Sequence, residues 1–92
     1  MLFIMKTTDS RLLDLADVLA GDDDKELLLI SDAVYLARRP VWEKLAGLKF
    51  DAVYAEKKAA EDRDLEIADG CTVLDMPEVV ELFVEHRKIV NL

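Results

Sequence analysis

The sequence predicts a single three-layer α/β domain, with a mostly parallel sheet of four to five strands and helices on both faces. Its 92 residues fit one domain, so residues 1–92 are assigned to one unit. Short β-favouring runs alternate along the chain with amphipathic stretches at helical spacing. Apolar residues make up 52% of the sequence and only 3 Gly and 2 Pro occur, which argues against disorder and low-complexity linkers.

The first third of the chain predicts two strands with a helix between them. Residues 2–6 form a short β-favouring run, and residues 7–10 are turn-forming and helix-capping types. Helical spacing then places four apolar positions on one face: Leu12, Leu15, Ala16 and Leu19. Gly21 ends this pattern, and the uninterrupted apolar run at residues 27–30 predicts a central strand that is covered on both faces.

The middle of the chain predicts short helices and a third strand. Ser31 and Asp32 offer an N-cap to a short helix over residues 33–37. Pro40 interrupts that helix, and a further turn or two follows over residues 41–45. Residues 50–55 predict the third strand, and the charged residues 56–63 predict a short exposed helix.

The last quarter of the chain holds the best-specified helix. A fourth strand is expected over residues 71–74, and Asp75, Pro77 and Glu78 then have the pattern of a capping box with Pro in the first turn. An apolar face of Val79, Leu82 and Phe83 lies opposite an acidic face of Glu78, Glu81 and Glu85. Residues 89–92 are long enough for a fifth strand at the edge of the sheet.

Charge and cysteine content limit the partners and the compartment. The net charge of −8 disfavours direct binding to nucleic acid or to an anionic membrane, because such binding depends on Lys and Arg. One cysteine cannot form an internal disulfide, and residues 1–6 are too short an apolar run for a signal peptide or a membrane span. We therefore expect a cytoplasmic protein. Small domains with this much apolar surface often bury the excess in a subunit interface.

Polar residues are expected to gather beyond the carboxyl ends of the strands, where parallel sheets carry their sites. These residues lie at 7–10, 31–32, Glu56 and Asp75, and several are acidic. Facing carboxylates could hold Mg²⁺, but Ser10, Ser31 and Asp75 are explained more simply as helix caps, and no metal site is predicted. Residues 6–10 contain no glycine, so a phosphate-binding loop is not expected, and no cofactor is predicted.

The single cysteine and the single histidine are the remaining candidates for chemistry. Cys71 is the one candidate for a reactive group, but it lies at the amino end of the fourth strand without a basic neighbour, which favours a buried structural thiol. His86 lies near a helix end, which favours a half-buried or dipole-complementing role over acid–base catalysis. No catalytic activity of the chain's own is expected.

A group of apolar and aromatic residues follows the second strand. Tyr35, Val41 and Trp42, with the neighbouring Val34, form a candidate interface for a partner. The same residues could equally form a roof over the core, and the sequence leaves both interpretations open.

The order of these segments is similar to a known family. The segments are the strand at residues 1–4, Leu-Leu-Leu-Ile-Ser-Asp-Ala-Val-Tyr at 27–35, Ala-Val-Tyr-Ala at 52–55, and Val-Leu-Asp-Met-Pro-Glu-Val-Val-Glu-Leu-Phe-Val-Glu-His at 73–86. With these segments the chain resembles, over nearly its whole length, the DsrH/TusB family, the small subunits of DsrEFH and TusBCD sulfur-relay complexes.

The resemblance implies a cytoplasmic three-layer α/β subunit that assembles with DsrE/TusD-like and DsrF/TusC-like subunits. Such complexes pass persulfide sulfur towards 2-thiolation of the tRNA wobble uridine or act in sulfur oxidation, and the principal sulfur-carrying cysteine belongs to the DsrE/TusD-type subunit. Some DsrH members carry a further cysteine near the end of the first helix, where this sequence has Leu19, Ala20 and Gly21. The charged-Arg-Gly pattern after the third strand is altered at residues 61–65, and Leu92 replaces the closing aromatic residue.

The leading hypothesis is therefore a non-catalytic structural or regulatory subunit of a sulfur-relay complex. One alternative is a small sulfurtransferase that carries a persulfide on Cys71. Another is a stand-alone binding module that buries its apolar surface by forming a homo-oligomer.

Overall fold

The computed structural model describes residues 1–92, and its five strands form one all-parallel sheet. The strands are β1 (Leu2–Met5), β2 (Glu26–Leu29), β3 (Ala52–Glu56), β4 (Thr72–Leu74) and β5 (Ile89–Asn91). The α-helices are α1 (Arg11–Ala20), α2 (Trp42–Ala46), α3 (Lys57–Asp62) and α4 (Met76–Glu85), and two 3₁₀ helices, η1 (Ser31–Ala37) and η2 (Arg39–Val41), precede α2. The order across the sheet is β4-β3-β2-β1-β5.

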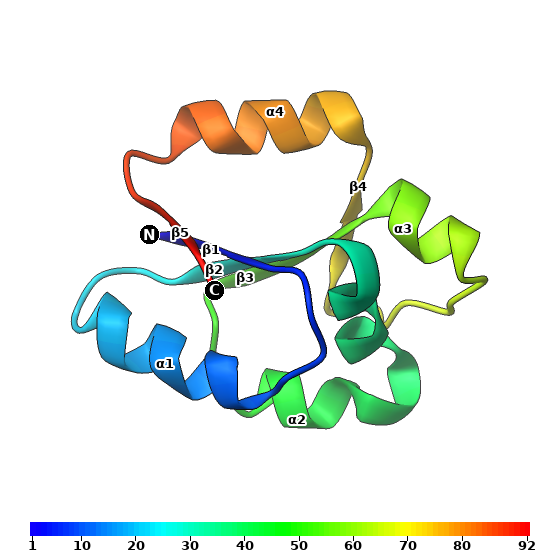
Figure 1. The fold of residues 1–92 in the computed structure, drawn as a ribbon, viewed down its shortest axis with the longest axis horizontal. Coiled ribbons are helices and arrows are strands. Elements are labelled where there is room, and N and C mark those ends of the chain that lie inside the picture. Colours follow the sequence, from blue (N-terminus) through cyan, green and yellow to red (C-terminus); the bar gives the residue numbers. More distant parts are fainter.

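The sheet separates two helical layers of unequal size (Figure 1). α1 and α2 lie on one face, and α4 covers the other face alone. This arrangement follows from the connections, because α4 links β4 at one edge of the sheet to β5 at the opposite edge and so crosses its full width. The predicted three-layer α/β class, with a mostly parallel sheet and helices on both faces, is confirmed.

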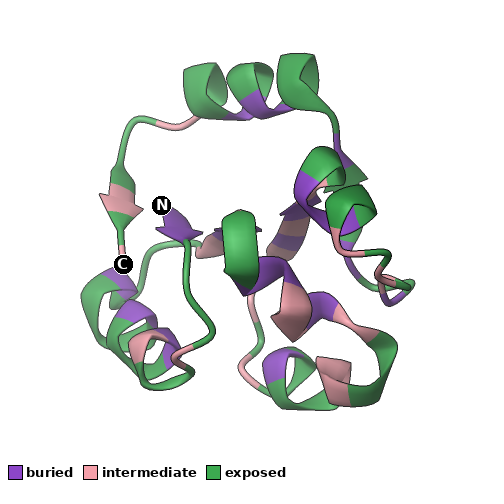
Figure 2. Ribbon diagram, turned by 45° about the vertical axis from the view of Figure 1, so that its right-hand side comes forward, coloured by how far each residue is buried: buried purple, intermediate pink, exposed green.

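Each face of the sheet has its own hydrophobic core. The larger core has 15 buried residues, among them Phe3, Met5, Leu27 and Leu29, and packs under α1, η1 and α2. The smaller core joins the opposite side chains of the same strands to α4, and its members are Leu2, Ile4, Leu28, Leu74, Val79 and Leu82. Figure 2 shows the buried residues in the strands and on the inner sides of the helices. The apolar run at β2 is central because both faces of that strand are covered.

The start of α4 is set by the capping box that the sequence predicts. The Asp75 carboxylate accepts a hydrogen bond from the Glu78 backbone N–H at 3.0 Å, and the Glu78 carboxylate accepts one from the Asp75 N–H at 3.1 Å. Two of the unpaired donors at the helix N-terminus are thereby satisfied. Val79 and Leu82 are buried as expected, whereas Phe83 keeps 36% of its surface exposed.

Two predicted caps are wrong. The side chains of Ser10 and Ser31 make no capping hydrogen bond. At α1, Asp9 takes the role instead, and its carboxylate accepts the Arg11 backbone N–H at 3.1 Å. Ser31 lies inside the helical segment with φ of +51°, because the short helix expected over residues 33–37 is a 3₁₀ helix that already begins at residue 31.

The helices are all short. α1 and α4, the longest, have ten residues each. No helix has the length and apolar character needed to cross a membrane.

Candidate functional site

A hollow of about 390 Å³ lies beyond the carboxyl ends of β1 and β2, which is the end of a parallel sheet where sites are expected. We call it the carboxyl-edge pocket. Residues after β1, after β2 and on α2 line it: Thr8, Ser10, Leu13, Tyr35, Leu36, Arg38, Val41, Lys44 and Leu45. Its wall combines apolar side chains and the Tyr35 ring with the hydroxyls of Thr8 and Ser10 and with two cations, and it contains no carboxylate.

The Arg38 side chain is held in place at this pocket by its surroundings. Its Nε donates a hydrogen bond to the Tyr35 carbonyl at 3.2 Å, and its guanidinium lies 5.4 Å from the centre of the Tyr35 ring. The guanidinium of Arg63 lies 5.9 Å from the same ring, so Tyr35 has two cation–π neighbours. The backbone of Arg38 is also fixed, because it forms an isolated antiparallel bridge with Ile67.

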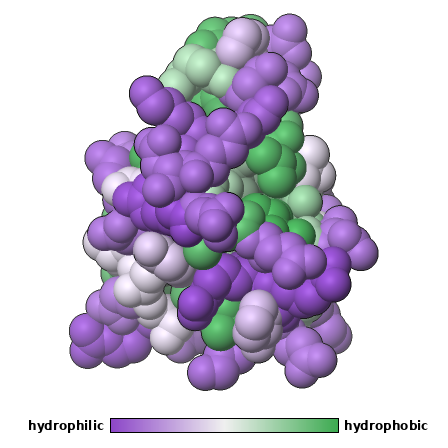
Figure 3. Space-filling view, turned by 90° about the vertical axis from the view of Figure 1, so that its right-hand side faces the viewer, coloured by the Kyte–Doolittle hydropathy of each residue, from purple (hydrophilic) through white to green (hydrophobic).

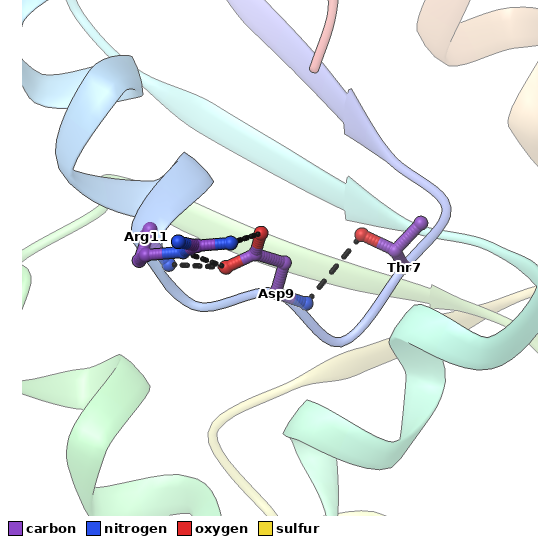
Figure 4. A network of polar contacts seen from close by, with 3 residues as sticks. All are labelled: Thr7, Asp9 and Arg11. Atoms are coloured by element: carbon purple, nitrogen blue, oxygen red, sulfur yellow. Dashed lines mark hydrogen bonds and ion pairs between the residues drawn. The ribbon is translucent and has the colours of Figure 1, made fainter.

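The turn that leads from β1 into the pocket is ordered by a short polar network (Figure 4). The Asp9 carboxylate accepts hydrogen bonds from the Arg11 side chain at 2.9 and 2.8 Å, and the Asp9 N–H donates to Thr7 Oγ1 at 3.4 Å. The hydrogen bonds from Arg11 lower the pKa of Asp9. The one carboxylate of this turn is therefore already paired.

The other polar residues predicted at the carboxyl edge do not form a metal site. Asp32 forms an ion pair with Arg63 at 2.8 Å, and Asp75 caps α4. No group of three or more His, Cys, Asp or Glu side chains in the structure is arranged to hold a metal ion. Asp32 and Asp75 thus have structural partners.

Cys71 lies at the opposite end of the sheet from the carboxyl-edge pocket. It immediately precedes β4 and belongs to the larger core, with 7% of its surface exposed. Burial raises the pKa of its thiol to about 12, which suppresses the thiolate that sulfur chemistry needs. These features fit the structural role that the sequence favoured.

The candidate interface residues occupy three different environments. Val34 has no exposed surface and lies in the larger core, so it has no surface for a partner in this structure. Tyr35 and Val41 line the carboxyl-edge pocket. Trp42 packs on Gly70 so closely that a Cβ on that glycine would lie 2.7 Å from the indole, and it therefore helps to cover the core. A partner contact at Tyr35, Val41 and Trp42 stays a prediction.

A polar network at the amino end of the sheet was not predicted from the sequence. Glu26 accepts a hydrogen bond from the Tyr54 hydroxyl at 2.5 Å, and its carboxylate lies 2.8 Å from His86 Nε2. The His86 and Glu26 side chains are only 13% and 21% exposed. Burial, followed by the bond to Glu26, raises the pKa of Tyr54 to about 12. One feature of the sequence could have indicated this network: Glu26 is two residues before Leu28 in β2, so both side chains lie on the face of the sheet that α4 covers.

Large apolar side chains remain exposed on the outer sides of two helices. On α4 they form one stripe, the α4 stripe, which consists of Met76, Val80, Phe83 and Val84. On α1 the exposed residues are Leu15, Val18 and Leu19. Figure 3, which views the molecule from the side where α4 begins, shows apolar side chains reaching the surface between polar ones.

The fold and its connections define a small α/β protein with a five-stranded all-parallel sheet. The chain belongs to the DsrH-like protein family, whose model matches residues 7–89. Membership in this family supports a role as a subunit of a multi-subunit sulfur-relay complex. The structure is also similar to the crystal structure of the YchN protein from E. coli, with a TM-score of 0.72 and 21% sequence identity over 99% of this chain and 97% of that chain. No curated protein sequence matches the chain significantly.

Proposed function

We propose that this chain is a non-catalytic structural or regulatory subunit of a cytoplasmic sulfur-relay complex. In this role it assembles with DsrE/TusD-like and DsrF/TusC-like subunits. The partners carry sulfur as a persulfide. That sulfur is then used for 2-thiolation of the tRNA wobble uridine, or the complex acts in sulfur oxidation. The observation that carries the proposal is membership in the DsrH-like family of a chain whose only thiol is buried.

The state of Cys71 supports a role without sulfur transfer. A persulfide carrier needs a thiolate that a donor protein can reach, since the thiolate is the nucleophile. Cys71 is inside the core, its pKa is raised to about 12, and no second cysteine exists in the chain. Sulfur transfer is therefore assigned to the partners.

The exposed apolar side chains on α4 and α1 support assembly. Val84 and Val18 are 81% and 77% exposed, and each belongs to a group of exposed apolar residues on its helix. Such groups on a small domain are typical of surfaces that are covered in a complex.

Co-expression with one DsrE-like and one DsrF-like chain, followed by native mass spectrometry, tests the proposal. We expect a stable hetero-oligomer that contains all three chains. A chain that stays monomeric beside both partners would contradict the proposal. A homo-oligomer that excludes both partners would favour the stand-alone binding module instead.

A further inference from the structure

The carboxyl-edge pocket concentrates unpaired positive charge in a chain with a net charge of −8. Arg38 and Lys44 both line the pocket, and neither has a carboxylate within ion-pair distance. Three of the four other arginines have such partners: Arg11 pairs with Asp9, Arg39 with Glu66 and Asp69, and Arg63 with Asp32, whereas Arg87 has none and lies outside this pocket. Two cationic side chains that line one pocket of an acidic protein without a carboxylate partner favour the binding of an external anion.

Arg38 is oriented before any ligand arrives. Its Nε donates a hydrogen bond to the Tyr35 carbonyl, and its guanidinium lies near the Tyr35 ring. Its terminal nitrogens have no acceptor in the structure. A guanidinium fixed in this way can offer its terminal N–H groups to an oxoanion at a low cost in side-chain entropy. The hydroxyls of Thr8 and Ser10, which also line the pocket, add further donors.

Two acidic residues near this edge are already held by other cations. The Asp9 carboxylate, in the same turn as Thr8 and Ser10, is bound by the Arg11 side chain (Figure 4). Asp32 is held by Arg63 at 2.8 Å. The carboxylates closest in sequence to the lining residues 8–10 and 35–38 are therefore neutralised by cations outside the pocket.

The rest of the lining is apolar. Leu13, Leu36, Val41, Leu45 and the Tyr35 ring make up more of the wall than the charged groups do. The volume of about 390 Å³ is within the range of roughly 300–1,000 Å³ typical of small-molecule sites. A bare inorganic anion would leave this apolar surface in water, whereas a ligand with an apolar body would cover it.

We propose that the carboxyl-edge pocket binds a small organic anion with a carboxylate or sulfonate group on an apolar or aromatic body. The anionic group lies between Arg38 and Lys44, and the body contacts Leu36, Val41 and the Tyr35 ring. The proposal does not depend on the role in sulfur relay, because the pocket is formed by this chain alone.

Titration of the isolated chain with benzoate, followed by amide NMR shifts, tests the proposal. We expect shifts centred on Thr8, Ser10, Tyr35 and Lys44, and much weaker shifts with the neutral analogue benzyl alcohol or with inorganic sulfate. Arg38→Gln should weaken benzoate binding roughly tenfold, because it removes a charge-assisted contact. Lys44→Gln should weaken it several-fold.

The matched control is Lys58→Gln, which removes the same charge from an exposed lysine on α3 that has no ion pair. It should leave benzoate affinity nearly unchanged. Since the Lys44 side chain makes no hydrogen bond within the protein, Lys44→Gln keeps the test valid even if Arg38→Gln unfolds the chain. Equal affinity for benzoate and benzyl alcohol, equal effects of the Lys44 and Lys58 variants, or no shifts with benzoate would each overturn the proposal.

Discussion

At the scale of single residues, the proposed role without sulfur transfer depends on the state of Cys71. The thiol is packed in the larger core at the amino end of the sheet, away from the carboxyl-edge pocket. Burial both hides the sulfur and raises its pKa to about 12. A sulfur donor would have to open the core before reaching it.

We predict slow modification of Cys71 in the folded chain. At pH 8 the thiol should react with a disulfide reagent such as Ellman's reagent far more slowly in buffer than in denaturant, because the native state contains almost no thiolate and little sulfur surface. Absorbance of the released thiol measures both rates. Rates in buffer equal to those in denaturant would show that the thiol is accessible.

Tyr54 leads to a prediction about stability at high pH. Its pKa is raised from 10.0 to about 12, so the folded chain holds the phenolic proton more tightly than the unfolded chain does. This contribution to stability is complete below pH 10 and is lost as the pH rises from 10 through 12. Tyr54→Phe should therefore show a smaller loss of stability over that interval, measured by urea unfolding at a series of pH values.

The control for this experiment is Tyr35→Phe, which removes the other tyrosine from the opposite end of the sheet. It should follow the pH dependence of the unchanged chain. The same dependence in the Tyr54 variant and the unchanged chain would contradict a tightened phenolic proton at position 54.

At the scale of elements, α4 is the sole cover of one face of the sheet, so its start should matter for the whole domain. Asp75→Ala removes the carboxylate that accepts the Glu78 N–H and should lower the free energy of unfolding by about 1 kcal/mol. Urea unfolding measures the change. Asp22→Ala is the matched control, because it removes the same charge from an exposed loop residue without a hydrogen-bond partner, and it should have little effect. Equal effects of the two variants would mean that the cap contributes nothing specific.

Local patterns were sufficient to predict most elements. The uninterrupted apolar run at β2, the capping box at Asp75 and the helical spacing in α1 depend on residues a few positions apart, and each produced the expected element. Ser10 is the residue that precedes α1, but the side chain that accepts a backbone N–H there is that of Asp9, because both residue types cap helices and only the backbone geometry separates them.

Contacts between distant residues were beyond the sequence patterns. The Glu26 carboxylate meets Tyr54 and His86, which are 28 and 60 positions away, and only the register of the strands and the end of α4 bring them together. The carboxyl-edge pocket likewise combines residues from three separate segments. The expectation that polar groups gather at this end of the sheet was general, whereas the unpaired state of Arg38 depends on where distant carboxylates lie in the folded chain.

The whole molecule has an uneven distribution of apolar surface. One face of the sheet is covered by several helices and the other by α4 alone. The α4 stripe on that single helix stays exposed. The α4 stripe is therefore a surface that the proposed assembly would cover.

We predict that Val84→Lys weakens assembly with the partner subunits at least several-fold while leaving the folded chain as stable as before. The Val84 side chain is 81% exposed in the isolated chain, so lysine costs nothing there, but a buried interface would have to desolvate the charge. Analytical ultracentrifugation of the mixed subunits measures the loss. Ala46→Lys on α2 adds the same charge at another exposed helix position and should assemble normally. Equal behaviour of the two variants would place the contact elsewhere than on the α4 stripe.

The proposed role makes two claims: this chain is a subunit of the complex, and it carries no sulfur itself. One measurement tests both claims. The assembled complex is incubated with a cysteine desulfurase and cysteine, and the intact mass of each released subunit is then determined. We predict that a partner subunit gains the mass of a sulfur atom while this chain keeps its original mass. A gain of one sulfur atom on this chain, localised to Cys71, would contradict the role proposed here and identify a sulfur carrier.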